Sequence, residues 1–129
     1  MKKVNESQPI DKNTAIKMVN AYSEEATRLN SGSYTKAVWF PAEQILAMAK
    51  KISEGKHDGL RIYFAQYIEE SLKDLPEDHR GRNTVLLVPT YAAGQTNARG
   101  EKTNAHEDDT ANIENRGDLC PTMCDGTEL

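Results

Sequence analysis

Apolar residues recur every three or four positions in two segments of the N-terminal half, and this spacing predicts two amphipathic helices. In the first segment the apolar stripe consists of Ile16, Val19, Tyr22, Ala26 and Leu29. The turn around Gly32 ends this segment, because glycine readily takes the left-handed conformation found at helix ends. The second segment begins at Pro41, which suits the first turn of a helix, and ends at Gly55. We therefore expect helices over residues 11–30 and 41–54.

Three further segments have the hydrophobic pattern of β-strands. Residues 37–40 are bulky and favour extended structure. In the segment 60–67, apolar residues alternate with Arg61 and tyrosines, which is the two-residue period of a strand. Residues 84–88 are almost continuously apolar, which is typical of a strand covered on both faces. We expect the last two strands to be antiparallel neighbours.

These elements predict an α/β (α+β) fold, in which a small sheet of about three or more strands carries both helices on one face. Residues 1–9 form a polar lead-in, and residues 10–91 form a single α/β domain. Residues 92–119 are poor in large apolar side chains, so we expect a polar loop or extension that lies over the other face of the sheet. Residues 120–129 form a short tail with two cysteines.

Composition and charge exclude two classes of protein. No apolar run approaches the roughly 20 residues that cross a bilayer, so we expect no membrane span. The net charge of −4 leaves no excess of cationic side chains for phosphates, so we expect no nucleic-acid partner. The first ten residues lack the apolar stretch of a secretory signal. We therefore expect a cytoplasmic protein, in a compartment where disulfides are uncommon.

Three segments, taken in order, resemble a known pattern: Gly59-Leu60-Arg61-Ile62-Tyr63-Phe64, then a strand ending in Val88-Pro89-Thr90, then Cys120-Pro121-Thr122-Met123-Cys124. The chain resembles a family of small uncharacterised bacterial proteins with an R-I-Y-F-like strand, a V-P-T-ending strand and a C-P-x-x-C tail. The resemblance spans about residues 37 to 124. Family members often carry a second proline where this chain has Thr122. The resemblance supports these domain limits and implies that the cysteine tail is an integral part of the protein. It assigns no catalytic residue.

The cysteine pair is the most distinctive chemical feature of the sequence. Cys120 and Cys124 are separated by three residues including a proline, so their thiolates can form half of a tetrahedral zinc site. We place His106 among the further ligands. Other ligands would come from His57, His79, Asp125 or the cysteine pair of a second chain. The alternatives are two free thiols, a disulfide that closes a small ring, or redox chemistry, although the usual C-x-x-C redox spacing is absent.

A second candidate site lies on the strand at residues 60–67. Arg61, Tyr63 and Tyr67 alternate along it, so a cation flanked by phenols would face one side and hold an anionic ligand. The alternative is that Arg61 pairs with a helix carboxylate, such as Glu24 or Glu43, while the tyrosines pack against its stem.

No segment of the sequence has the pattern of a nucleophile with its base or of a phosphate-binding loop. We therefore assign no catalytic residue and no cofactor other than the possible zinc. The leading hypothesis is a non-catalytic protein-interaction module whose partner is another protein or a second copy of itself. A metal-binding protein and a small anion binder or enzyme are the two alternatives.

Overall fold

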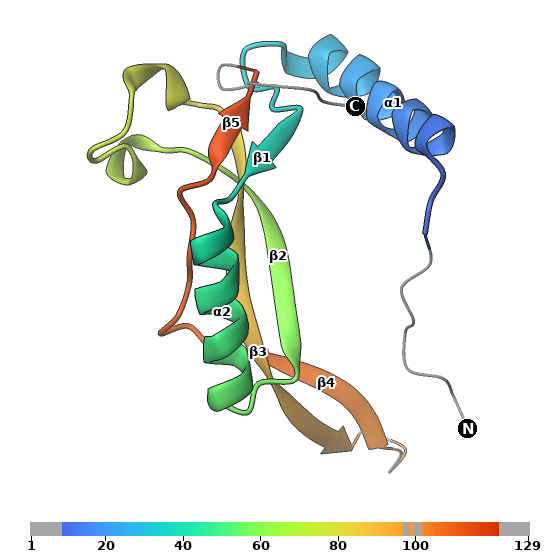
Figure 1. Ribbon diagram of the computed structural model, residues 1–129, viewed down its shortest axis with the longest axis vertical. Coiled ribbons are helices and arrows are strands. Elements are labelled where there is room, and N and C mark those ends of the chain that lie inside the picture. Colours follow the sequence, from blue (N-terminus) through green and yellow to red (C-terminus); the bar gives the residue numbers. More distant parts are fainter. Residues whose placement is uncertain (1–8, 97–98, 100–101, 122–129) are drawn as a thin grey trace.

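The computed structural model describes residues 9–96, 99 and 102–121 (Figure 1). Within this part of the chain it contains two α-helices and two small antiparallel sheets, so the predicted α+β class is confirmed. No helix in the described part is both long and apolar enough to cross a bilayer.

Both predicted helices form close to their expected bounds. Helix α1 spans Lys12–Asn30, and its N-terminus is capped by Asp11, whose side chain accepts a hydrogen bond from the Thr14 amide at 3.2 Å. Helix α2 spans Ala42–Glu54 and follows Pro41 directly. An amide hydrogen in the first turn of a helix has no hydrogen-bond partner within the helix, and proline has no such hydrogen to leave unpaired.

The larger sheet has the strand order β2-β3-β4, and both pairs of strands are antiparallel. Its strands are β2 (Gly59–Gln66), β3 (Asn83–Thr96) and β4 (Lys102–Asp108). The predicted antiparallel pairing of the two apolar strands is thus confirmed. Ile62 lies opposite Leu87, so these two side chains share one face of the sheet. Arg61 and Tyr63 lie on the other face, because successive side chains of a strand alternate.

The polar segment after residue 91 differs from the expected loop. It contains the second half of β3 and all of β4, so the expected domain boundary falls inside a strand. Beyond β4 the chain runs along the edge of β3, where the Leu87 amide donates to the Glu114 carbonyl at 2.8 Å and the Glu114 amide donates back at 2.9 Å. Composition misses this hairpin because a strand ladder is held by backbone hydrogen bonds, which polar residues make as well as apolar ones.

The strand predicted at residues 37–40 forms, but it does not join the larger sheet. Strand β1 (Ala37–Trp39) pairs instead with β5 (Asp118–Cys120) in a separate two-stranded sheet. Ala37 lies opposite Cys120, and the Lys36 amide donates to the Cys120 carbonyl at 2.5 Å. The prediction of a single sheet is wrong because β5 has no apolar run of its own, so the pattern gives β1 no visible partner.

Beside this small sheet lies a compact apolar cluster. Its buried members are Tyr67, Leu72 and Leu119, and Val38 packs against them. Leu119 is fully buried, and the Tyr67 hydroxyl donates to the Asn115 side chain at 2.7 Å. The C-terminal strand therefore supplies the centre of the cluster.

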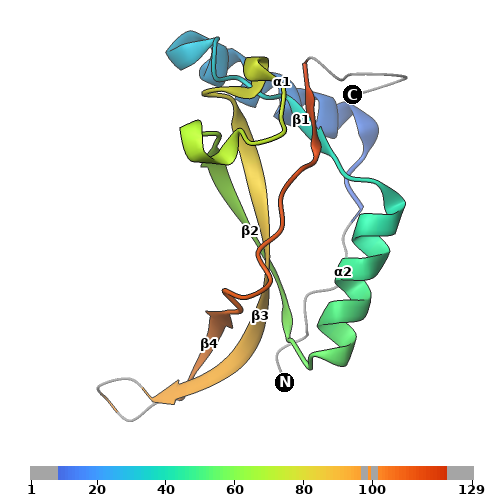
Figure 2. The same cartoon turned by 90° about the vertical axis from the view of Figure 1, so that its left-hand side faces the viewer.

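Helix α1 does not pack on the sheet, contrary to expectation. It lies across the end of the sheet (Figure 2) and extends away from it (Figure 1), and none of its residues is buried. Its connections include a 2.5 Å hydrogen bond between the hydroxyls of Ser23 and Tyr34 and a contact between the rings of Tyr22 and Tyr34, 6.0 Å apart. The sequence pattern identifies an apolar helix face but not the surface that covers it.

The two remaining helical turns lie between β2 and β3, in the segment rich in acidic residues. They are the 3-10 turns Glu69–Ser71 and Glu77–His79.

Candidate functional site

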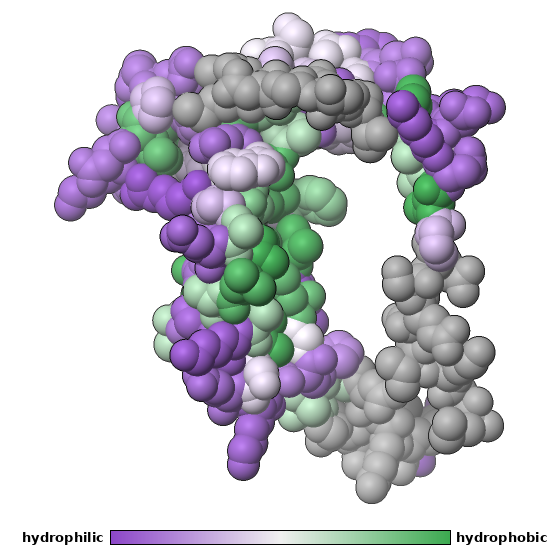
Figure 3. Space-filling model, viewed as in Figure 1, coloured by the Kyte–Doolittle hydropathy of each residue, from purple (hydrophilic) through white to green (hydrophobic). Residues whose placement is uncertain are grey.

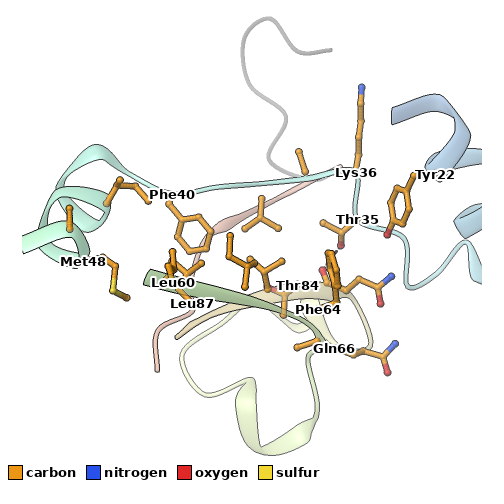
Figure 4. A pocket seen from close by; sticks show the side chains of 18 of the residues that line it. Tyr22, Thr35, Lys36, Phe40, Met48, Leu60, Phe64, Gln66, Thr84 and Leu87 are labelled. Carbon is orange, nitrogen blue, oxygen red and sulfur yellow. Dashed lines mark hydrogen bonds between the residues drawn. The ribbon is translucent and has the colours of Figure 1, made fainter. Parts of the chain in front are cut away.

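An open groove of about 1270 Å³ lies between α2 and one face of β2 and β3 (Figure 4). Apolar side chains from both structures make up most of its lining. They include Ile45, Met48, Ile52, Leu60, Ile62, Phe64, Val85 and Leu87. Only Met48 of α2 is buried, so the helix covers one side of the groove and leaves the other open.

Strand β2 provides the exposed floor of this groove. Leu60, Ile62 and Phe64 lie on one face of the strand, and their exposed fractions are 40%, 52% and 92%. On the neighbouring strand, Leu87 on the same face is only 3% exposed. The open part of the groove is therefore the outer strand of the sheet.

The end of the groove nearest α1 is polar. Tyr22, Thr35 and Gln66 gather there (Figure 4). The Thr35 hydroxyl donates to the Asn83 carbonyl at 2.5 Å, and the Gln66 amide donates to the Ser33 hydroxyl at 3.2 Å. These polar groups hold the segment between α1 and β1 against the sheet.

The size and shape of the groove suit a segment of another macromolecule. Sites for small molecules typically measure about 300–1,000 Å³ and enclose most of the ligand. This groove is larger, and Phe64 on its floor is almost fully exposed. Figure 3 shows hydrophobic side chains gathered over β2 and α2, beside the open space that separates them from α1. Contiguous exposed apolar surface of this kind is the type through which proteins bind one another, and it makes the groove the candidate site.

The sequence pattern placed Leu60, Ile62 and Phe64 on one face of a strand and did not mark that face as a site. The alternation of Leu60, Ile62 and Phe64 identified the correct strand face. It did not reveal that the face stays open, because covering it depends on where α1 goes.

The structure separates the three residues of the predicted anion site. Arg61 and Tyr63 lie together, and both bond to Asp108: the Arg61 guanidinium donates to its carboxylate at 2.7 Å, and the Tyr63 hydroxyl donates to its other oxygen. The hydrogen bond with Tyr63 and the charge of Asp108 raise the pKa of Arg61. Tyr67 lies beyond the end of β2, in the buried cluster. The partner of Arg61 is therefore Asp108 on β4, and neither Glu24 nor Glu43.

A small polar pocket of about 390 Å³ lies next to Arg61. Its lining includes Asp58, which accepts a hydrogen bond from the Thr90 hydroxyl at 2.5 Å and pairs with His106. The hydrogen bond from Thr90 and then the contact with His106 lower the pKa of Asp58. The charges of this pocket are thus matched by ion pairs within the chain. Asp58 and Asp108 were not predicted, because their pairing across strands has no signal in the sequence.

The predicted metal ligands are not brought together in the described part of the chain. His106 lies on β4 and Cys120 on β5, at opposite ends of the molecule (Figure 1). Cys120 is disulfide-bonded, whereas Cys124 and Asp125 lie outside the described residues. Among residues 9–96, 99 and 102–121, no group of three or more His, Cys, Asp or Glu side chains is placed to hold a metal ion.

The histidines considered as further ligands have partners of their own. His57 contacts the Asp109 carboxylate at 2.9 Å and stacks on Tyr91, with 4.4 Å between ring centres. The hydrogen bond to His57, followed by that from Asn112, lowers the pKa of Asp109 to about 2. His79 contacts Asp78 at 3.1 Å. The His57–Asp109 pair joins the turn after α2 to the end of β4 and is best explained as a structural tie.

Comparison of the chain with protein-family models, curated proteins and solved structures found no match. The resemblance to small bacterial proteins with a C-P-x-x-C tail therefore stays a prediction. The groove is the feature from which a function is inferred.

Proposed function

We propose that this protein is a non-catalytic interaction module whose apolar groove binds the apolar face of an amphipathic helix from a protein partner. The observation that carries the proposal is the exposed floor of the groove, formed by Leu60, Ile62 and Phe64. Water contacts this surface in the isolated chain. Burying it against a partner is favourable by about 25 cal/mol per Å² of apolar surface, and this free energy drives association.

A helix is the occupant that fits the shape and chemistry of the groove. Helices with apolar residues at positions i, i+3 or i+4, and i+7 bind in hydrophobic grooves through that face. A helix is about 10 Å wide, which matches the spacing between elements packed through side chains. The lining supplies apolar contacts along its length and polar groups at one end, near Thr35 and Gln66. The net charge of −4 favours a protein partner over a nucleic acid.

The test uses the full chain with isotope-labelled isoleucine and leucine methyl groups. A synthetic amphipathic helix is added, and a scrambled peptide of the same composition serves as the control. We expect the amphipathic peptide alone to shift the methyl signals of Ile45, Ile62 and Leu60, which line the groove. The outcome that overturns the proposal is an equal response to both peptides, or no response to either at a concentration where the chain is monomeric.

A pair of matched variants locates the binding surface. Phe64 and Leu46 are both exposed apolar residues, at 92% and 69%, and only Phe64 lines the groove. Phe64→Lys should abolish the peptide-induced shifts, because a charge on the floor cannot be desolvated without a partner. Leu46→Lys should leave them unchanged. Equal loss in both variants would contradict the assignment of the groove as the binding surface.

The proposed setting is the bacterial cytoplasm, the expectation from the sequence. Disulfides are uncommon in that compartment, so the bond at Cys120 makes the redox state of the cysteines the property that tests this setting. Titration of thiols in protein isolated with a rapid alkylating quench separates the two settings. Reactive thiols support the cytoplasm, and their absence contradicts it.

A further inference from the structure

We infer that the helix that fills the groove is α1 of a second copy, so that two chains exchange their α1 helices in a reciprocal homodimer. This inference rests on the proposed function, because it names the helix that the groove receives. The homodimer is thus the partner to test first.

Helix α1 has an apolar stripe that nothing in the described part of its own chain buries. Within the stripe, Tyr22 and Leu29 are 47% and 70% exposed, Ile16, Val19 and Ala26 are half-buried, and no residue of α1 is fully buried. The stripe of an amphipathic helix in a globular protein normally faces a core. The described chain therefore carries a largely uncovered apolar helix face and an open apolar groove, and packing one against the other removes both from water.

The two surfaces also match in length. Helix α1 has 19 residues, which at 1.5 Å per residue makes it about 28 Å long. The floor of the groove is β2, whose eight residues extend about 26 Å at 3.3 Å per residue. One α1 helix therefore covers the length of one groove.

The attachment of α1 leaves Tyr22 as the one residue of the helix among those that line its own groove. The Ser33 carbonyl accepts a hydrogen bond from the Asn83 amide at 2.8 Å, and Thr35 donates to the Asn83 carbonyl at 2.5 Å. These bonds hold the linker at the end of the sheet, and Tyr34 bonds to Ser23 of α1. From this point α1 runs away from α2 and β2 (Figure 1). Folding back onto its own groove would break the contacts of Tyr34 with the helix.

The surface area that the helices bury explains why the exchange should be reciprocal. A helix about 28 Å long and 10 Å wide covers about 280 Å² of groove, so one docked helix buries roughly 560 Å² over both surfaces. Two exchanged helices bury roughly 1,100 Å² in total, close to the lower limit of about 1,200 Å² for stable specific interfaces. A single docked helix falls well short of that limit. We therefore expect a dimer whose population depends on protein concentration.

The first experiment is sedimentation equilibrium of the full chain between about 1 and about 500 μM. We expect a monomer–dimer equilibrium in this range. Phe64→Lys in the groove and Val19→Lys in the stripe of α1 should each weaken dimerisation by roughly tenfold or more, because each places a charge in an apolar interface. Leu46→Lys and Ala21→Lys, at exposed positions outside the groove lining and the stripe, should leave it unchanged.

Mixing the two interface variants separates exchange from other kinds of dimer. The Phe64→Lys chain keeps an intact α1, and the Val19→Lys chain keeps an intact groove. Their mixture should form mixed dimers through one intact helix–groove contact, more strongly than either variant alone. Circular dichroism checks that each variant is folded. If the mixture dimerises no more strongly than either variant alone, the exchange is contradicted.

Cross-linking identifies which copy supplies the helix. Chains that carry both Val19→Cys and Ile62→Cys are prepared in light and isotopically heavy forms, mixed, and treated with a bismaleimide. We expect cross-links that join the thiol introduced in α1 of one isotope to the thiol introduced in β2 of the other. Links confined to a single isotope would mean that α1 closes on its own groove, and links between the β2 thiols of two chains would mean pairing of β2 edges. Either result overturns the inference.

The outcomes also separate this inference from the proposed function. If the chain stays monomeric while the amphipathic peptide still shifts the methyl signals of the groove, the groove binds a helix from a different protein, and only the inference fails. If the peptide has no effect either, both fail.

Discussion

Replacement of Leu119 by alanine tests whether the C-terminal strand is an essential part of the fold. Leu119 is fully buried and packs with Tyr67 and Leu72, the other two buried residues of its cluster. We expect Leu119→Ala to lower the free energy of unfolding by about 3 kcal/mol. Loss of buried methylene and methyl groups accounts for most of this, at roughly 0.8 kcal/mol per group, and the cavity that remains adds the rest.

The magnitude is large for a protein of this size. Domains are stable by about 5–15 kcal/mol, so the substitution should remove a substantial part of the total. The measurement is urea denaturation of both proteins at equal concentration, followed by circular dichroism. Leu46→Ala is the control, because Leu46 is 69% exposed and its truncation should change stability by less than about 0.5 kcal/mol. A Leu119→Ala loss below about 1 kcal/mol would refute the placement of Leu119 at the centre of the cluster.

Two other predictions concern a glycine and a titrating pair. Gly117→Ala should destabilise by about 1–3 kcal/mol, because a β-carbon there would crowd Val38 and lie 3.0 Å from the Trp39 carbonyl; Gly59→Ala, whose nearest atom lies at 3.8 Å, should be neutral in the same denaturation assay. Asp109 has its pKa lowered to about 2, so its stabilising contribution is complete above its unfolded value of 3.8 and is lost as pH falls from there toward 2. The urea midpoint should fall as pH is lowered through that window, and Asp109→Asn should make this dependence on pH weaker. The same pH dependence in the variant would count against the His57–Asp109 tie.

Periodicity in the sequence was sufficient to predict the elements that have strong local patterns. The spacing of Ile16, Val19 and Tyr22 predicted α1, and the alternation along residues 60–67 predicted β2 and its two faces. The continuous apolar run that includes Leu87 and Val88 predicted a well-covered strand, and both residues are buried. These properties depend on residues that are close together in the chain, which is why they could be predicted from local patterns in the sequence.

Properties that depend on distant partners could not be predicted in this way. Strand β5 pairs with β1 through backbone hydrogen bonds, and its three residues have no period to detect. Asp108 bonds Arg61 only because the register of three strands brings them together. The groove exists because α1 leaves the sheet, and this direction is set by contacts of Tyr34 and Asn83 outside the helix itself.

The pairing of β1 with β5 has a consequence for the order in which the protein is made. The hairpin of β2 and β3 joins residues that the ribosome adds within a short interval, so it can form early during synthesis. Ala37 has to wait for Cys120, its partner across the small sheet, before β1 is fixed. Val38 in β1 and Phe40 just after it line the groove, so they settle after its floor has formed. The groove is therefore complete only after residues 118–120 have left the ribosome and paired with β1.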